Sequence, residues 1–153
     1  MIFPYIQAKD FGPEVVANMT RIASEVRKIL PPELPCGIQI LAGGNKEALA
    51  VSQACGLQFI RCEGYVFSHV ADEGWMDSCA GELLRYRNTI GCENVSVFVD
   101  IKKKHSAHAV TGDISLSETV KAAEFFLSDG VILTGTSTGV QADPQDLTDG
   151  MKS

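Results

Sequence analysis

The stretch VSVFVDIKKKHSAH, residues 95–108, passes from an apolar run to a cluster of charged side chains without a break. Its β-branched residues recur at every second position, which is the period of a β-strand: Val95, Val97, Val99 and Ile101. Charged residues appear on the opposite face only from Asp100 onward. Because α/β proteins carry their chemistry at the carboxyl ends of parallel strands, we expect a functional site where this strand ends.

Composition indicates a globular, acidic protein. The chain has 153 residues, of which 45% are hydrophobic, enough for one packed core. We expect a single domain over residues 1–153, with a disordered tail over residues 140–153. The net charge of -6 argues against nucleic-acid binding, which needs a basic face. No apolar run approaches the ~20 residues that cross a bilayer, and no signal-peptide pattern opens the chain, so we predict an intracellular protein.

The cysteines show no regular spacing and include no C-x-x-C pair: Cys36, Cys55, Cys62, Cys79 and Cys92. An odd number of cysteines without a frame is typical of a reducing compartment, which predicts the cytoplasm or the mitochondrial matrix. Cys55 and Cys62 lie in apolar surroundings in the sequence. We interpret them as small buried hydrophobes rather than catalytic thiols.

Helical and strand patterns alternate along the chain. Period-3.6 segments predict helices over residues 13–30, 46–55, 76–90 and 117–127, the last with Ser117 as its N-cap. Between them, period-2 or apolar runs predict strands over residues 37–42, 57–64 and 130–136, in addition to the strand that starts at Val95. This order predicts a parallel α/β fold. Polar residues that point inward from consecutive strands favour part of a TIM barrel, with about four of its eight strands, over an open doubly wound sheet.

The second predicted strand carries Arg61 and Glu63 on one face. A strand that is covered on both sides should be almost wholly apolar, so these charges need partners. If the charged strands are neighbours, Arg61 and Lys102 can neutralise Glu63 and Asp100 across the same face. A structural layer of salt bridges is the alternative to a reactive site. A further alternative is that Lys102 is a desolvated, Schiff-base lysine.

Two histidines, His105 and His108, follow the strand end at a spacing of three residues. We favour a general acid or base, or a phosphate contact, from this pair. A metal site completed by His69, Asp72 or Glu73 is the alternative, but the spacing matches no established ligand pattern. The sequence therefore predicts neither a metal nor a cofactor.

The turn GTSTG, residues 135–139, follows the last predicted strand. Its glycines allow backbone N–H groups to converge on an anion, with hydroxyl groups beside them. Gly135, Thr136 and Gly139 are therefore candidate ligand contacts. A tight strand exit with no ligand explains the same residues equally well.

Several long segments together resemble the BtpA family, over residues 4–139. They are GIQILAGGNKEALAVSQACGLQFIRCEGYVFSHVADEG, AGELLRYR, DIKKKHSAH, KAAEFF and DGVILTGTSTG. The resemblance implies a (β/α)8 barrel of ligand-binding type whose substrate is not established. It also implies a role in stabilising photosystem I in photosynthetic members, which cannot be general because relatives without photosystems exist. Family members carry two further strand–helix units before the third strand and continue beyond the sixth. We therefore expect this chain to be a truncated isoform with little activity, which oligomerises through open sheet edges.

Two hypotheses of different class follow. The first is an enzyme or binder of a small phosphorylated or sugar-like metabolite, with Glu63, Asp100, Lys102 and His105 as catalytic residues. Its ligand contacts would be Asn45, Arg61, His108, Gly135, Thr136 and Gly139. In this hypothesis His105 or Glu63 acts as acid or base, and Lys102 stabilises developing charge. The second is a non-catalytic assembly or stability factor that binds a protein partner.

Overall fold

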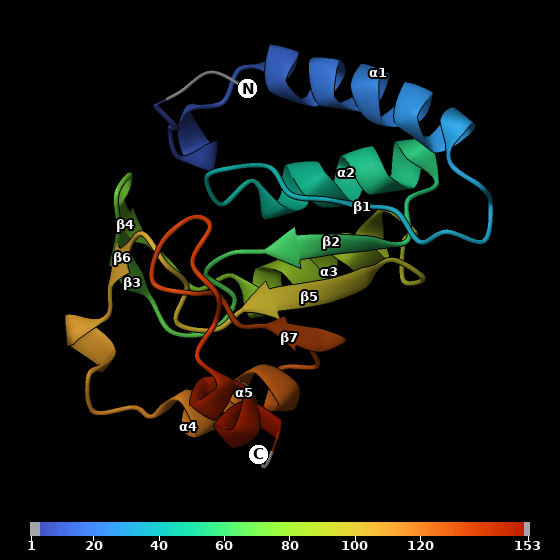
Figure 1. Cartoon of the computed structure of the whole chain (residues 1–153). Coiled ribbons are helices and arrows are strands. Elements are labelled where there is room, and N and C mark those ends of the chain that lie inside the picture. The colour runs from blue at the N-terminus through green and yellow to red at the C-terminus, as the bar shows by residue number, and fades with distance from the viewer. Residues whose placement is uncertain (1–3, 152–153) are drawn as a thin grey trace. The chain divides into compact units, whose positions relative to one another are not determined.

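The computed structural model describes residues 4–151, in which helices alternate with strands (Figure 1). Four parallel strands form one sheet in the order β1-β2-β5-β7. Their bounds are β1 Gly37–Ile38, β2 Phe59–Cys62, β5 Ser96–Asp100 and β7 Gly130–Ile132. Within the described residues this sheet does not close into a barrel. The predicted α/β class with parallel (β/α) units, consistent with part of a TIM barrel, is confirmed.

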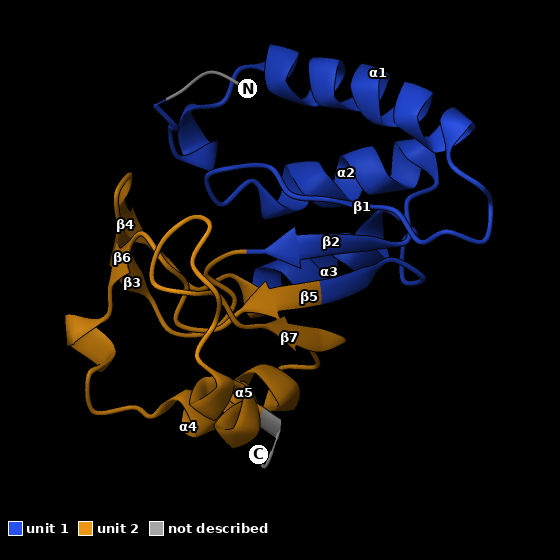
Figure 2. Cartoon of the chain, in the orientation of Figure 1, with its two compact units in different colours: residues 1–62, 81–97 blue, residues 63–80, 98–153 orange. Residues whose placement is uncertain are grey.

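The chain divides into two compact units (Figure 2). The first comprises residues 1–62 and 81–97, and the second comprises residues 63–80 and 98–153. Strand β5 runs from one range into the other. The expectation of a single domain stays a prediction.

The first unit is built on helix α2, Asn45–Cys55, which contacts β1, β2 and the long helix α1, Pro13–Ile29. Helix α3, Ala80–Thr89, and the short 3-10 helix η1, Ala8–Asp10, complete its helices. Helix α2 ends at Gly56, which has the left-handed φ of 64° that glycine favours. Its core consists of fully buried aliphatic side chains: Ala48, Leu49, Val51 and Ile60.

Helix α1 buries none of its side chains, although its sequence is strongly amphipathic. Its apolar residues Ile22 and Ile29 are 61% and 82% exposed. Exposing an apolar helix face of this kind to water costs free energy, and such faces are typical of surfaces that bind a partner.

The second unit contains a three-stranded antiparallel sheet in the order β4-β3-β6, which we call the rim sheet. Its strands are β3 His69–Ala71, β4 Gly74–Met76 and β6 Ser106–Ala107. Because β6 pairs with β3, the loop that follows β5 is tied by hydrogen bonds to the loop that follows β2. The unit also holds η2 Ala109–Thr111, α4 Leu116–Phe125 and α5 Pro144–Met151.

Three local features differ from the sequence predictions. The loop over residues 65–74 contains the β3–β4 hairpin, in which Val70 pairs with Trp75, so α3 begins at Ala80 instead of residue 76. The N-cap of α4 is Ser115, not Ser117, because Ser115 and Glu118 form a reciprocal capping box. The two serines have the same intrinsic cap propensity, but only Ser115 has a glutamate three residues later.

The segment for which we expect a disordered tail contains helix α5. Its start is well specified, because Pro144 occupies the first helical position and Asp143 Oδ1 accepts a hydrogen bond from Gln145 N at 2.8 Å. Helix α5 contacts α4. Among residues 4–151, no helix is both long enough and apolar enough to span a membrane.

Two glycines on outer strands each face an aromatic ring on the neighbouring strand. Gly37 is the register partner of Phe59, and Gly130 is the register partner of Phe98. A Cβ atom at Gly37 would lie 2.3 Å from the Phe59 ring, and one at Gly130 would lie 2.5 Å from the Phe98 ring. These rings occupy the space that a side chain on the outer strand would otherwise fill.

Candidate functional site

A buried ion pair lies in the second unit, between two residues that each follow a strand. Glu63 directly follows β2, and Lys103 lies three residues beyond the end of β5. Glu63 Oε1 lies 3.0 Å from Lys103 Nζ, and the two side chains are only 4% and 8% exposed. Charges removed from water to this extent are stable only when they are paired, so each residue depends on the other.

Lys103 replaces Lys102 as the cation that reaches the interior. Lys102 has a φ of 42°, so the strand alternation stops before it and the next side chain turns inward. Lys102 Nζ instead donates a hydrogen bond to the carbonyl of Thr111 at 3.1 Å. The expectation that Arg61 and Lys102 neutralise Glu63 and Asp100 did not include Lys103, which forms an ion pair with Glu63 in the structure.

The loops around the site hold several non-glycine residues in left-handed backbone conformations. These are Phe67 with φ 56°, Lys102 with φ 42° and His105 with φ 58°. Such conformations cost about 1–3 kcal/mol each and concentrate at functional sites, where the surrounding structure holds them in place.

His69, the first residue of β3, is the buried imidazole of the site. Its side chain is 5% exposed, and its ring centroid lies 5.4 Å from that of His108. The Phe67 backbone acts on the ring as a hydrogen-bonding group that raises its pKa, whereas Nε2 has no hydrogen-bond partner among the described residues. Burial, and then the nearby charges of Lys103 and His108, lower the pKa of His69. His69 is therefore neutral at physiological pH.

His108 acts on the backbone that carries Lys103. Its Nε2 lies 3.0 Å from the carbonyl oxygen of Lys103 and donates a hydrogen bond to it. This bond fixes the turn after β5 and hence the direction of the Lys103 side chain. The position of the Lys103 side chain therefore depends on the hydrogen bond from His108.

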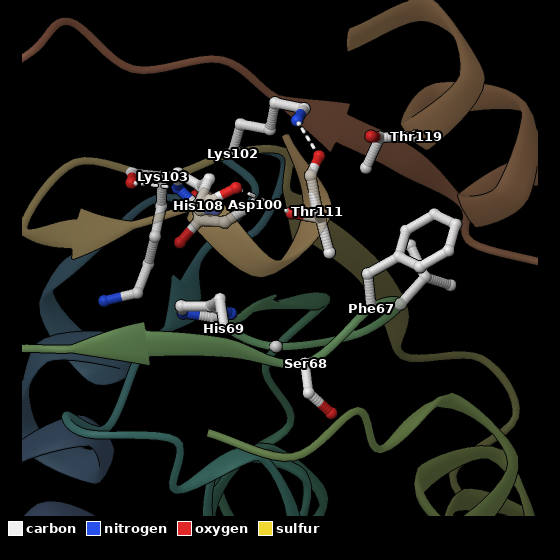
Figure 3. Close-up of a pocket in the computed structure, with 11 residues that line it drawn as sticks. Phe67, Ser68, His69, Asp100, Lys102, Lys103, His108, Thr111 and Thr119 are labelled. Carbon is white, nitrogen blue, oxygen red and sulfur yellow. Dashed lines mark hydrogen bonds between the residues drawn. The ribbon is translucent and has the colours of Figure 1, made fainter. Parts of the chain in front are cut away.

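These side chains surround a small cavity of about 20 Å³ (Figure 3). A buried site needs roughly 10–15 Å³ of such space for one water molecule, so the cavity accommodates a single hydroxyl group or water. The polar residues that line it include His69, Asp100, Lys102, Lys103, His108 and Thr111. Asp100 is 8% exposed, so two cations and a buried carboxylate share this space with the neutral imidazole.

Of the predicted catalytic residues, Asp100 and Lys102 line the cavity, whereas Glu63 and His105 do not. His105 is partly exposed, with Nδ1 3.6 Å from Asp72 Oδ2 and Nε2 3.1 Å from Thr138 Oγ1. Among the described residues, no group of three or more metal-binding side chains is close enough to hold a metal ion. His105 thus belongs to the exposed surface of the second unit.

The GTSTG turn lines a separate hollow in the second unit. Gly135 and Thr136 share this hollow with Asp143 and Asp146, whose negative charges disfavour a phosphate group. A Cβ atom at Gly135 would lie 2.1 Å from the carbonyl oxygen of Val140. The close approach of these two backbone segments is sufficient to explain the glycine, and favours the tight strand exit over the anion nest.

The other two predicted ligand contacts belong to the first unit. Asn45 is buried at the start of α2, and Arg61 lies in β2. The remaining predicted site residues, including Gly139, belong to the second unit.

Comparison with known proteins now shows the family. The BtpA family model matches residues 3–152. The chain belongs to the BtpA family.

BtpA-family relatives come from animals, archaea and cyanobacteria. An uncharacterized protein of Caenorhabditis elegans, named as mitochondrial, is 49% identical over 97% of this chain and 54% of its own length. An uncharacterized protein of Archaeoglobus fulgidus is 36% identical over 91% of this chain and 54% of its own. The photosystem I biogenesis protein BtpA of Synechocystis is 32% identical over 88% of this chain and 46% of its own length. The chain thus spans about half the length of the curated relatives it matches. No solved structure matches it.

The sequence reasoning missed Lys103 and treated His69 only as a candidate metal ligand. A run of three lysines does not reveal which one turns inward, since that depends on the residue at which the strand ends. The signal for His69 was its position within an unusually long loop after a strand that carries charge. In this BtpA-family chain, that loop folds into the hairpin that places the imidazole.

Proposed function

We propose that the cavity in the second unit is the binding site of an enzyme that acts on a small phosphorylated or sugar-like metabolite. The observation that carries the proposal is the buried Glu63–Lys103 ion pair next to a cavity that is lined by Lys103 and the neutral His69. A salt bridge that serves only stability is weak evidence of function by itself. The additional buried carboxylate and imidazole are the groups that acid–base chemistry requires.

The proposed roles follow from charge and position. Lys102 and Lys103 supply positive charge for a phosphate or for a developing oxyanion, and an ammonium that makes one hydrogen bond keeps two further donors. Glu63 keeps Lys103 in position, and Asp100 is the carboxylate of the cavity lining that we assign as acid or base. The hydroxyl or water that the cavity admits is the part of the ligand that enters, while the rest lies at its mouth.

Calorimetric titration of the purified chain tests this proposal. The probes are inorganic phosphate, glycerol 3-phosphate and ribose 5-phosphate, with ribose as an uncharged comparison. Lys102→Met removes one lining cation without breaking the buried pair, and we expect it to weaken binding of the phosphorylated probes about tenfold. Lys28→Met is the matched control, because Lys28 is exposed on α1 and pairs with Glu25 in the first unit. No binding of any probe, or equal binding by the Lys102 variant, would contradict the proposal.

The second candidate function is that of a non-catalytic assembly or stability factor. It is favoured by the exposed apolar residues of α1, including Ile22, Val26 and Ile29. Replacing Ile22 and Ile29 by serine should abolish association with a partner, or self-association through this face, while leaving the binding of phosphorylated probes intact. Sedimentation of the unmodified chain and of the double serine variant tests this role. Identical sedimentation of the two would argue against it.

We also place the protein in a reducing compartment such as the mitochondrial matrix. The proposal is supported by five free thiols and by the name of the Caenorhabditis elegans relative. Fluorescence microscopy of the tagged protein tests it, and a secreted protein would refute it.

A further inference from the structure

The hydrogen bonds of His69 determine which ring nitrogen carries its proton. The Phe67 backbone raises the pKa of His69, which a carbonyl does only by accepting from a ring N–H, so one ring nitrogen is that donor. Nε2 has no partner among the described residues, which identifies Nδ1 as that donor. In the neutral imidazole Nε2 therefore presents a lone pair. A buried acceptor without a donor is costly, and the loss is recovered only when something donates to it.

The surroundings of His69 favour this neutral form. Burial and the positive charge of Lys103 lower its pKa, and His108 acts in the same direction, while Glu63 opposes them. Asp100 and Lys102 also line the cavity that His69 faces. Lys103 in addition offers positive charge to any oxygen that approaches Nε2.

The free space beside the imidazole fits one hydroxyl group. The cavity measures about 20 Å³, which is too small for a phosphate or a sugar ring but sufficient for a single oxygen. Gly64 also lines this space, and a Cβ atom there would lie 3.8 Å from His69 Cε1, in van der Waals contact with the ring. Figure 3 shows His69 and Lys103 among the residues that line the cavity.

We infer that His69 Nε2 is the proton acceptor of this site and that its donor is a hydroxyl group of the ligand. The inference rests on the proposed function and narrows the ligand to a phosphorylated compound that also carries a hydroxyl. In the proton transfer the O–H bond breaks and the Nε2–H bond forms. The negative charge left on the oxygen is stabilised by the Lys103 ammonium, and Glu63 lies close enough to influence the imidazolium.

Two substitutions of His69 separate the acceptor from the anchoring bond. His69→Asn keeps an amide nitrogen near the position of Nδ1, which can still donate to Phe67, but it has no atom at Nε2. His69→Gln places an amide near the position of Nε2, where its oxygen can still accept a hydrogen bond. If His69 has only a structural role, the glutamine variant should lose more ligand binding than the asparagine variant. If Nε2 is the acceptor, the asparagine variant should lose more.

Calorimetry with glycerol 3-phosphate and n-propyl phosphate measures the hydroxyl contact directly, because both probes carry a phosphate monoester. For the unmodified chain we expect about tenfold tighter binding of the glycerol compound. We expect His69→Asn to abolish this preference and His69→Gln to retain part of it. Equal binding of the two probes by the unmodified chain would overturn the inference while leaving the proposed function in place. If neither probe binds, the proposed function fails and this inference fails with it.

Long-range ¹H–¹⁵N NMR of the imidazoles provides an independent readout that needs no ligand. We expect Nδ1 of His69 to be protonated and Nε2 to show the chemical shift of an unprotonated nitrogen at pH 7. A protonated Nε2 would overturn the inference whatever the probes show.

Discussion

Removal of the Lys103 charge should destabilise the second unit strongly. Two unit charges 3.0 Å apart attract each other by about 5 kcal/mol at an effective dielectric constant of ~20. Lys103→Met deletes one partner and leaves Glu63, only 4% exposed, without that ion pair. Breaking a buried pair in this way typically costs about 3–5 kcal/mol. We therefore expect a loss of that size in the free energy of unfolding.

Urea unfolding, followed by circular dichroism and by the fluorescence of Trp75, measures this loss. Lys102→Met is the matched control, because its ammonium gives up only one hydrogen bond to the carbonyl of Thr111, worth about 0.5–1.5 kcal/mol. The double variant Glu63→Gln with Lys103→Met should recover part of the loss, since neither charge is then buried alone. Equal losses for the two lysine variants would refute the inward placement of Lys103.

Four further predictions follow from other parts of the chain. Burial and the charge of Lys103 lower the pKa of His69, so the imidazole takes up a proton at a higher pH in the unfolded chain than in the folded one. The free energy of unfolding should therefore fall as the pH drops below about 6.5. In melting experiments at several pH values, His69→Asn should weaken this pH dependence. Burial raises the pKa of the Cys92 thiol, so Cys62 and Cys92 should react slowly with a maleimide in the native state, and Cys36 faster; labelling at equal rates would contradict this. Gly135→Ala should cost roughly 1–3 kcal/mol, because its Cβ would meet the Val140 carbonyl, whereas Gly112→Ala, which meets its nearest atom at 3.3 Å, should cost less in the same urea assay. Finally, β1 and β7 are the outer strands of the open sheet, so sedimentation should show self-association, and a strict monomer at high concentration would refute it.

The period-2 pattern predicted the alternating burial along β5 correctly. Val97 and Val99, assigned to one face of this strand, are fully buried. Ser96 and Phe98, on the opposite face, are only partly buried. These assignments succeeded because strand geometry forces alternate side chains to opposite faces.

Prediction failed where the backbone leaves that regular geometry. The left-handed conformation of Lys102 has no signature in the residue type, so the sequence did not indicate that Lys103 pairs with Glu63. The pairing of β3 with β6 joins residues more than thirty positions apart, and no local pattern specifies it. His69 begins β3 and His108 directly follows β6, so this pairing brings the two histidines together. The inner part of the site therefore depends on tertiary structure.

The pairing of small and large residues between strands has a consequence for evolution. In each outer pair of the sheet a glycine faces a phenylalanine ring, so one ring fills the volume of two positions. A relative that carries a small residue where this chain has Phe98 would leave a void unless the residue matching Gly130 became larger. Positions 98 and 130 should therefore covary in size across the family, as should positions 59 and 37. A relative with bulky residues at both members of a pair would have to separate the two strands.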